Sequence, residues 1–289
     1  MDILIGILPA LLWGVGPLIA TKFGGKPIEQ LLGTGYGQLV VGIVIYIFTR
    51  PAISFNEFLW PFLGGVAWAV AQYMQFSSFT KMNVSSAMPI STGLQLIEIP
   101  LCGVIFFGEW GSPLAKLIGF LSIALLILGT TCTSYVDKKV VRKKMDYKAG
   151  IPLLVIGSFG YTACSVFPRI TNASGLVGLL PQTFGMMLGA LIVAFILNGS
   201  ETFGYLKSKV TMKSGIIGIL GGLGTLAYLT SLKLNGVANA FPLTQMNVVV
   251  STIGGLIILK EHKNKKEITF TVVGLLMIVI SAILIGHLE

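Results

Sequence analysis

Charged residues are scarce in this chain. Asp, Glu, Lys and Arg make up 11% of its 289 residues, whereas an ordinary soluble domain carries about 25%. So few charges cannot cover a water-exposed surface, and most of the surface is expected to face lipid. Acidic residues number 11 against 20 basic ones. Basic chains often bind nucleic acid, but these cations lie in short loops between apolar segments, so we expect no nucleic-acid partner.

Cysteine and histidine are also rare. Cys102, Cys132 and Cys164 lie in or beside apolar segments at no metal-ligand spacing, and we interpret them as small buried hydrophobic residues. His262 and His287 stand at segment ends, so no histidine relay crosses a membrane. The sequence contains no phosphate-binding loop and no Ser-His-Asp set. We therefore expect no enzyme activity, no cofactor and no metal.

Long apolar stretches are abundant. A helix needs about 20 apolar residues to cross a bilayer, and helices are the default because every backbone group must find a partner inside the membrane. The pattern predicts an all-α integral membrane protein with ten transmembrane helices. They run over 3–20, 31–49, 58–79, 84–107, 113–136, 149–170, 176–198, 213–233, 237–259 and 267–288.

A basic run between residues 138 and 148 divides the chain. The loops that follow the odd-numbered segments hold 16 Lys and Arg, including this run, and the other loops hold 4. Basic loops stay in the cytoplasm. The sequence therefore predicts a multi-pass cell-membrane protein with both termini outside and the central basic loop in the cytoplasm.

The two halves resemble each other. Gly64-Gly65, Ala87-Met88-Pro89-Ile90 and Glu109 are matched in order by Gly221-Gly222, Ala240-Phe241-Pro242-Leu243 and Glu261. Because each half holds five segments, an odd number, the second half enters the membrane from the opposite side. The sequence predicts a first repeat at 1–137, a cytoplasmic connector at 138–148 and a second, inverted repeat at 149–289. Inverted repeats are typical of secondary transporters, whose sites lie near the midplane.

Several strings extend this pattern into a family resemblance. They are Leu8–Gly14, Lys22–Pro27, Leu32-Gly33-Thr34, Ala87–Leu96, Gly108-Glu109-Trp110, Leu180-Pro181-Gln182, Gly185-Met186, Leu243-Thr244-Gln245 and Ser251–Gly255. With them the chain resembles the drug/metabolite transporter superfamily and, within it, the bacterial glucose/ribose uptake permeases. The resemblance implies proton-driven uptake of a monosaccharide, glucose or ribose.

Amide and aromatic side chains inside the segments are the candidate sugar ligands. A side-chain amide both donates and accepts, as sugar hydroxyls do, and amides are costly in lipid unless a polar cavity surrounds them. Trp68, Gln72 and Gln75 share one helix face by their spacing, and so do Thr92, Gln95 and Glu98. The predicted substrate-binding residues are Trp13, Trp68, Gln72, Thr92, Gln95, Tyr228, Asn239 and Gln245, with Gln38, Gln182 and Asn247 as further candidates. The alternative role for these amides is to hold helices together.

Glu98 is the one carboxylate in the middle of a predicted segment; the other ten lie at segment ends, in loops or at the termini. A carboxylate in the membrane usually marks a functional position because its charged form is costly there. We therefore predict that Glu98 couples transport to protons, with a permanently protonated or hydrogen-bonded side chain as the alternative. The repeat offers no acidic counterpart, and an acid here does not define the resembled family.

Two other functions remain open at this point. An exporter of amino acids or other small metabolites could use the same fold, although paired fixed charges in the segments would then be expected. A membrane scaffold or enzyme is disfavoured by the absence of catalytic sets and large loops. The expected partners are a small sugar, protons and the lipid bilayer. The sequence does not indicate the preferred sugar or the oligomeric state.

Overall fold

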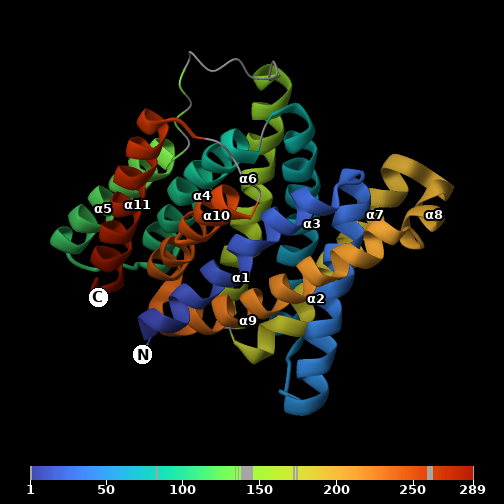
Figure 1. Cartoon of the computed structure of the whole chain (residues 1–289). Coiled ribbons are helices and arrows are strands. Elements are labelled where there is room, and N and C mark those ends of the chain that lie inside the picture. Colours follow the sequence, from blue (N-terminus) through green and yellow to red (C-terminus); the bar gives the residue numbers. More distant parts are fainter. Residues whose placement is uncertain are drawn as a thin grey trace.

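The computed structural model describes residues 2–82, 84–133, 135, 137, 146–171, 173, 175–258 and 263–288. Over these ranges the chain is helical and contains no strand (Figure 1). Most of the basic run lies outside the described residues, and Lys148 belongs to the first turn of a helix. The helices are α1 (Asp2–Phe23), α2 (Pro27–Thr49), α3 (Phe55–Lys81), α4 (Val84–Phe107), α5 (Pro113–Thr133), α6 (Tyr147–Ile170), α7 (Leu176–Asn198), the 3-10 turn η1 (Gly199–Glu201), α8 (Thr202–Leu206), α9 (Lys209–Thr244), α10 (Asn247–Ile257) and α11 (Lys265–Gly286).

The helices expose large apolar side chains on their outer surface. Phe48 is 83% exposed, Ile196 is 76% exposed and Ile257 is 72% exposed, which suits contact with lipid tails better than contact with water. Among the described residues, eight helical stretches are long and apolar enough to cross a membrane. The protein is therefore an all-helical, multi-pass membrane protein.

This set of eight differs from the prediction at three segments, 58–79, 213–233 and 237–259. The helix α3 is not among the eight stretches, because it carries several amides and hydroxyls along its length. Residues 209–254 form one stretch of 46 residues, which is more than twice the length needed for a single crossing. Within it Gly236 has φ 71° and ψ 177°, so the helix is interrupted there.

The ends of several helices are set by local sequence. Ser54 and Glu57 form a capping box at the start of α3, where the serine hydroxyl accepts from the Glu57 N–H and the Glu57 carboxylate accepts from the Ser54 N–H. Asn264 and Glu267 do the same for α11. These pairs satisfy backbone donors that a helix N-terminus leaves unpaired.

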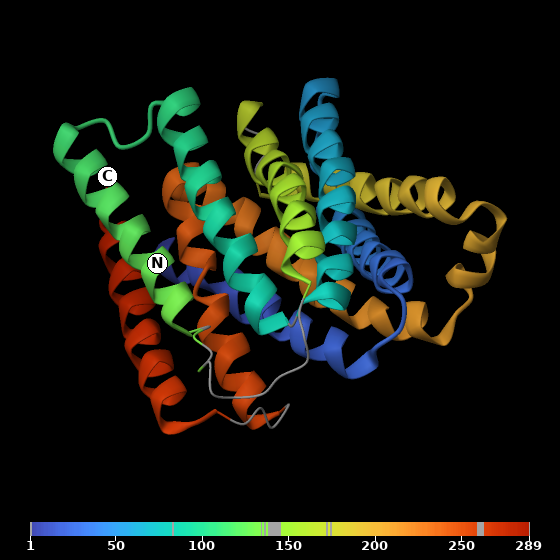
Figure 2. The same cartoon turned by 90° about the horizontal axis from the view of Figure 1, so that it is seen from above.

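The helices pack in a few extensive pairs. The helix α3 lies against α6 and α7, α9 lies against α1 and α2, and α5 lies against α11 (Figures 1 and 2). Gly37 of α2 permits one of these contacts: a Cβ there would collide with the backbone carbonyl of Gly215 in α9. Small residues at such crossings let backbones approach closely, which is how membrane helices associate. The start of α1 and the end of α11 lie near each other on one side of the molecule (Figure 1).

Candidate functional site

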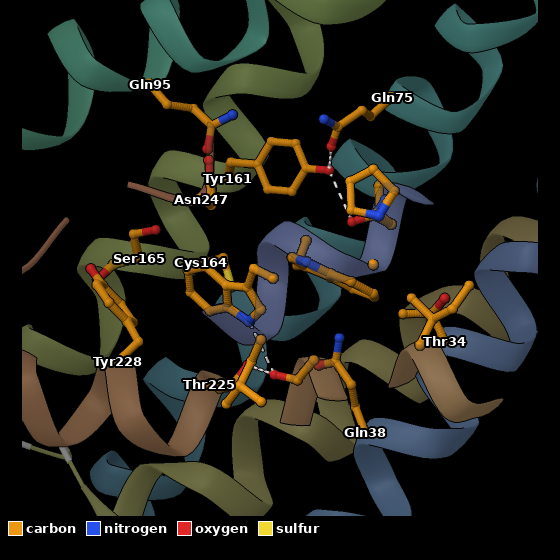
Figure 3. A pocket seen from close by; sticks show the side chains of 18 of the residues that line it. Thr34, Gln38, Gln75, Gln95, Tyr161, Cys164, Ser165, Thr225, Tyr228 and Asn247 are labelled. Carbon is orange, nitrogen blue, oxygen red and sulfur yellow. Dashed lines mark hydrogen bonds between the residues drawn. The ribbon is translucent and has the colours of Figure 1, made fainter. Parts of the chain in front are cut away.

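A cavity of about 180 Å³ lies between helices of both halves. Its walls come from α1, α2, α3, α4, α6, α7, α9 and α10, and none of the described residues that line it is charged. This volume is many times what one water molecule needs, so the cavity can hold a small organic molecule. Figure 3 shows part of its wall, where amides and hydroxyls alternate with aromatic rings.

Most of the predicted binding residues meet in this cavity. Seven of the eight line it: Trp13, Trp68, Gln72, Thr92, Gln95, Tyr228 and Gln245. The further candidates Gln38, Gln182 and Asn247 line it as well. Residues from distant parts of the sequence are therefore gathered around one cavity. The side chains at helical spacing on α3, Trp68, Gln72 and Gln75, line it, and so do Thr92 and Gln95 on α4.

A tyrosine on α6 organises the amides of α3. The hydroxyl of Tyr161 donates to Oε1 of Gln72 at 3.0 Å and also contacts Oε1 of Gln75 (Figure 3). Sequence reasoning did not single out Tyr161. Its only signal was a lone tyrosine within the apolar segment 149–170, and a single residue has no periodicity that would show where it points.

Two aromatic rings form another part of the wall. The indole N–H of Trp13 donates to the carbonyl oxygen of Gly221 at 3.2 Å, and the hydroxyl of Tyr228 donates to the carbonyl oxygen of Ser165 at 3.1 Å. The ring centroids of Trp13 and Tyr228 are 5.8 Å apart. Because their polar atoms are occupied within the protein, the two residues can offer their ring surfaces to the cavity. Such surfaces pack well against apolar C–H groups.

Cys164 also lines the cavity, and it is buried as the sequence predicted. The side-chain amide of Gln182 donates to the carbonyl oxygen of Cys164 at 2.8 Å and to its Sγ at 2.9 Å. Cys102, Cys132 and Cys164 are free thiols. Cys164 therefore belongs to the contact between α6 and α7 at the cavity wall.

Glu98 is half-buried between α4 and α6 and is not among the lining residues. Its Oε1 lies 2.7 Å from the Ser158 hydroxyl and its Oε2 lies 2.7 Å from the Thr162 hydroxyl. Both hydroxyls come from α6, four residues apart. The carboxyl group is thus hydrogen-bonded beside the cavity, on the two helices that carry Gln95 and Tyr161 into it.

Asn239 is the predicted residue that the cavity does not include. Its Oδ1 accepts from the Trp110 indole N–H at 2.8 Å, and its Nδ2 donates to the Leu288 carbonyl oxygen at 2.9 Å. Asn239 and Gln245 lie six residues apart, which leaves their side chains about 120° apart around a helix of 3.6 residues per turn. The two side chains therefore point in different directions, and only Gln245 lines the cavity.

Glu109 follows α4 and reaches the break in α9. Its carboxylate oxygens accept from the backbone N–H groups of Val237 at 2.9 Å and Ala238 at 2.6 Å. Nε of Arg169 lies 3.8 Å from Glu109 Oε1. Glu109 thus caps the helical segment that begins after Gly236. Its predicted counterpart, Glu261, lies outside the described residues.

A family model described as "Sugar transport protein" matches residues 4–288 of the chain. The Bacillus subtilis "Glucose uptake protein GlcU" is 38% identical over 292 residues, covering 99% of this chain and 98% of that protein. The Latilactobacillus sakei "Putative ribose uptake protein RbsU" is 39% identical over 284 residues, covering 97% and 96%. A solved crystal structure with 17% sequence identity superposes with a TM-score of 0.73, covering 100% of this chain and 99% of that chain. This last similarity is one of fold alone.

Proposed function

This chain belongs to the sugar transport protein family, and from that premise we propose that it imports a monosaccharide, glucose or ribose, by proton symport through alternating access. The cavity is the proposed binding site. Trp13, Trp68, Gln72, Thr92, Gln95, Tyr228 and Gln245 are its proposed ligands. Asn239 is bonded to Trp110 and Leu288 here, and we propose that it contacts the sugar only in another conformation of the transport cycle.

The chemistry of the cavity wall is the observation that carries this proposal. Amides and hydroxyls match the hydroxyl groups of a sugar, and the faces of Trp13 and Tyr228 match its apolar C–H faces. An amino acid carries two opposite charges at neutral pH and would call for charged partners, but the lining residues within the described ranges are all uncharged. A neutral polyhydroxy compound therefore suits the wall better than an exported amino acid does.

We propose that the chain forms an inverted repeat of two five-helix halves, 1–137 and 149–289, and the pairing of its helices supports this. In this arrangement each helix of the first half corresponds to one of the second. The corresponding pairs are α1 and α6, α2 and α7, α3 and the first part of α9, α4 and the end of α9 with α10, and α5 and α11. If the halves are exchanged, the contact α3–α6 maps onto α9–α1, α3–α7 onto α9–α2, and α4–α6 onto α10–α1. All six of these helix pairs are in contact, so the two halves pack in corresponding ways. We propose ten membrane spans arranged in this way. Rocking of one half against the other would open the cavity alternately to each side.

Glu98 is the proposed proton carrier. The Ser158 hydroxyl has one proton and two oxygens within reach, Glu98 Oε1 at 2.7 Å and Val155 O at 2.8 Å. A protonated Glu98 can donate to the Ser158 hydroxyl, which then donates its own proton to the carbonyl oxygen of Val155. An ionised Glu98 can accept from Ser158 and Thr162. Each state keeps hydrogen bonds through rotation of hydroxyl groups alone, which suits a group that gains and loses a proton.

Uptake of radiolabelled ribose and glucose into proteoliposomes tests the function. We expect accumulation only when an inward proton gradient is imposed. Absence of gradient-stimulated uptake for every pentose and hexose would refute sugar symport.

The role of Glu98 needs a separate variant. Glu98→Gln is expected to abolish gradient-driven accumulation while sugar exchange continues, because the amide cannot take up and release a proton at neutral pH. Glu201→Gln removes an exposed carboxylate in η1, outside the cavity lining, and serves as the matched control. Full accumulation by Glu98→Gln would remove its proposed role.

Orientation is tested by labelling. With both termini outside, the segment between α2 and α3 faces outward and η1 faces the cytoplasm. In a background without native cysteines, Ala52→Cys is expected to react with an impermeant maleimide in intact cells, and Ser200→Cys is not. Both positions are exposed. The opposite pattern would invert the proposed topology.

A further inference from the structure

Three buried amide oxygens at the cavity have no partner among the described residues. They are Oε1 of Gln38, Oε1 of Gln182 and Oδ1 of Asn247. Gln38 is 3% exposed and Gln182 is 1% exposed. Burying a hydrogen-bond acceptor without a partner costs free energy, so these oxygens require an explanation.

The amide nitrogens of the same wall are largely used within the protein. Nε2 of Gln182 donates to the Cys164 carbonyl oxygen, Nε2 of Gln95 donates to Ser91, and Nε2 of Gln245 donates to Thr244. For Gln182 this bond also sets the orientation of the amide, because the reverse orientation would put two carbonyl oxygens together. These three amides thus use donors within the protein, and the oxygens of Gln38, Gln182 and Asn247 stay available to a ligand, whereas those of Gln72 and Gln75 already face the Tyr161 hydroxyl.

The three oxygens come from different walls, on α2, α7 and α10. Figure 3 shows Gln38 and Asn247 on opposite sides of the cavity. Oxygens on opposite sides of a cavity do not form the compact shell that one cation needs. A ligand with several O–H groups around its ring could.

We propose that the cavity recognises its ligand through hydroxyl groups that donate hydrogen bonds to Gln38, Gln182 and Asn247. This rests on the proposed sugar-binding function and specifies it further. The ligand is a neutral, unmodified monosaccharide. Phosphorylated or O-alkylated sugars are excluded because those groups replace a donor with an acceptor, and the part of the cavity wall that the structure describes carries no cation to receive a phosphate.

Fluorinated sugars separate donation from acceptance. A fluorine atom is similar in size to a hydroxyl group and can accept weakly, but it cannot donate. With purified protein, binding of each monodeoxy and monofluoro analogue of the transported sugar is measured by competition against the radiolabelled parent. At the positions facing the three oxygens, we expect both analogues to bind roughly five- to tenfold more weakly than the parent, as loss of one hydrogen bond implies.

Two results would overturn this inference while leaving sugar transport intact. One is that every fluoro analogue binds like the parent at the positions where its deoxy counterpart binds weakly, which would make the hydroxyl groups acceptors. The other is that no deoxy analogue loses affinity. If no unmodified pentose or hexose binds at all, the sugar function itself fails, and donor recognition fails with it.

Two variants test which ring position of the sugar donates to Gln38 and which donates to Asn247. Gln38→Met and Asn247→Leu keep most of the side-chain volume and remove the acceptor. Each is expected to erase the fluoro penalty at one ring position and to leave the penalties elsewhere unchanged. A merely structural role would weaken all sugars equally and would contradict the proposal. Asn198→Leu, at the end of α7 and outside the cavity lining, is the matched control.

Discussion

Gly236 is the position where a single methyl group should be most informative. Its φ of 71° and ψ of 177° lie in a region that is essentially restricted to glycine, and occupying such a region costs other residues about 1–3 kcal/mol. A Cβ there would also stand 2.6 Å from Oε1 of Glu109. The carboxylate would have to move away from the N–H groups of Val237 and Ala238 that it caps.

The expected destabilisation follows from these two effects. A hydrogen bond to a charged group contributes about 1.5–3 kcal/mol, so weakening two of them adds to the backbone strain. Gly236→Ala should therefore lower the free energy of unfolding by ~3–6 kcal/mol. At roughly 2–4 °C per kcal/mol for larger chains, the melting temperature in detergent, followed by tryptophan fluorescence, should fall by roughly 6–24 °C.

Two other glycines separate strain from collision. Gly175 has a φ of 66° but open space around its would-be Cβ, so Gly175→Ala should report backbone strain alone. Gly204, in α8, has neither feature, and Gly204→Ala should be neutral or slightly stabilising. In a Glu109→Ala background, Gly236→Ala should cost only the strain. Additivity of the two substitutions within about 0.5 kcal/mol, or a Gly236→Ala cost no larger than that of Gly175→Ala, would refute this reasoning.

Two further predictions concern the cavity and the helix contacts. Tyr161→Phe frees the Gln72 and Gln75 carbonyls and should raise the sugar Kd about five- to tenfold; Tyr205→Phe, outside the cavity lining, is the control, and an unchanged Kd would contradict the orienting role. Gly37→Ala forces a methyl against the Gly215 carbonyl and should lower the free energy of unfolding by about 1–3 kcal/mol. Gly215→Ala in the same contact, with its nearest neighbour at 3.7 Å, should be tolerated, and equal melting temperatures would disprove the packing argument.

The helical architecture could be predicted because apolar length is a local property. The predicted boundary between 213–233 and 237–259 coincides with the break at Gly236. The break at Gln245 and Met246 was not predicted, because both residues sit inside an uninterrupted apolar segment. The short helix α8 was not predicted either, since five residues show too little periodicity.

The candidate site was predictable where several polar residues share a helix face. Trp68, Gln72 and Gln75 repeat at helical spacing, and the structure brings them to one cavity. Tyr161 and Asn239 show the limit of this approach. The direction of a lone side chain depends on how neighbouring helices pack and where a helix breaks, and neither is encoded in the spacing around that residue.

Under the proposed inverted repeat, corresponding positions of the two halves line the cavity with different chemistry. Trp68 lies three residues after Gly64-Gly65 and Thr225 lies three residues after Gly221-Gly222, and both line the cavity. Thr92 and Gln245 each lie three residues after the proline of their repeat, and both line it too. Under the proposed exchange of halves, the indole of Trp68 therefore corresponds to the hydroxyl of Thr225, and the hydroxyl of Thr92 corresponds to the amide of Gln245. A monosaccharide has no twofold symmetry, so a site lined identically by both repeats could bind it in two orientations. Under the proposed function, the divergence at these positions would give the sugar one preferred orientation, while the matching helix arrangement would retain the symmetry that the proposed alternating access requires.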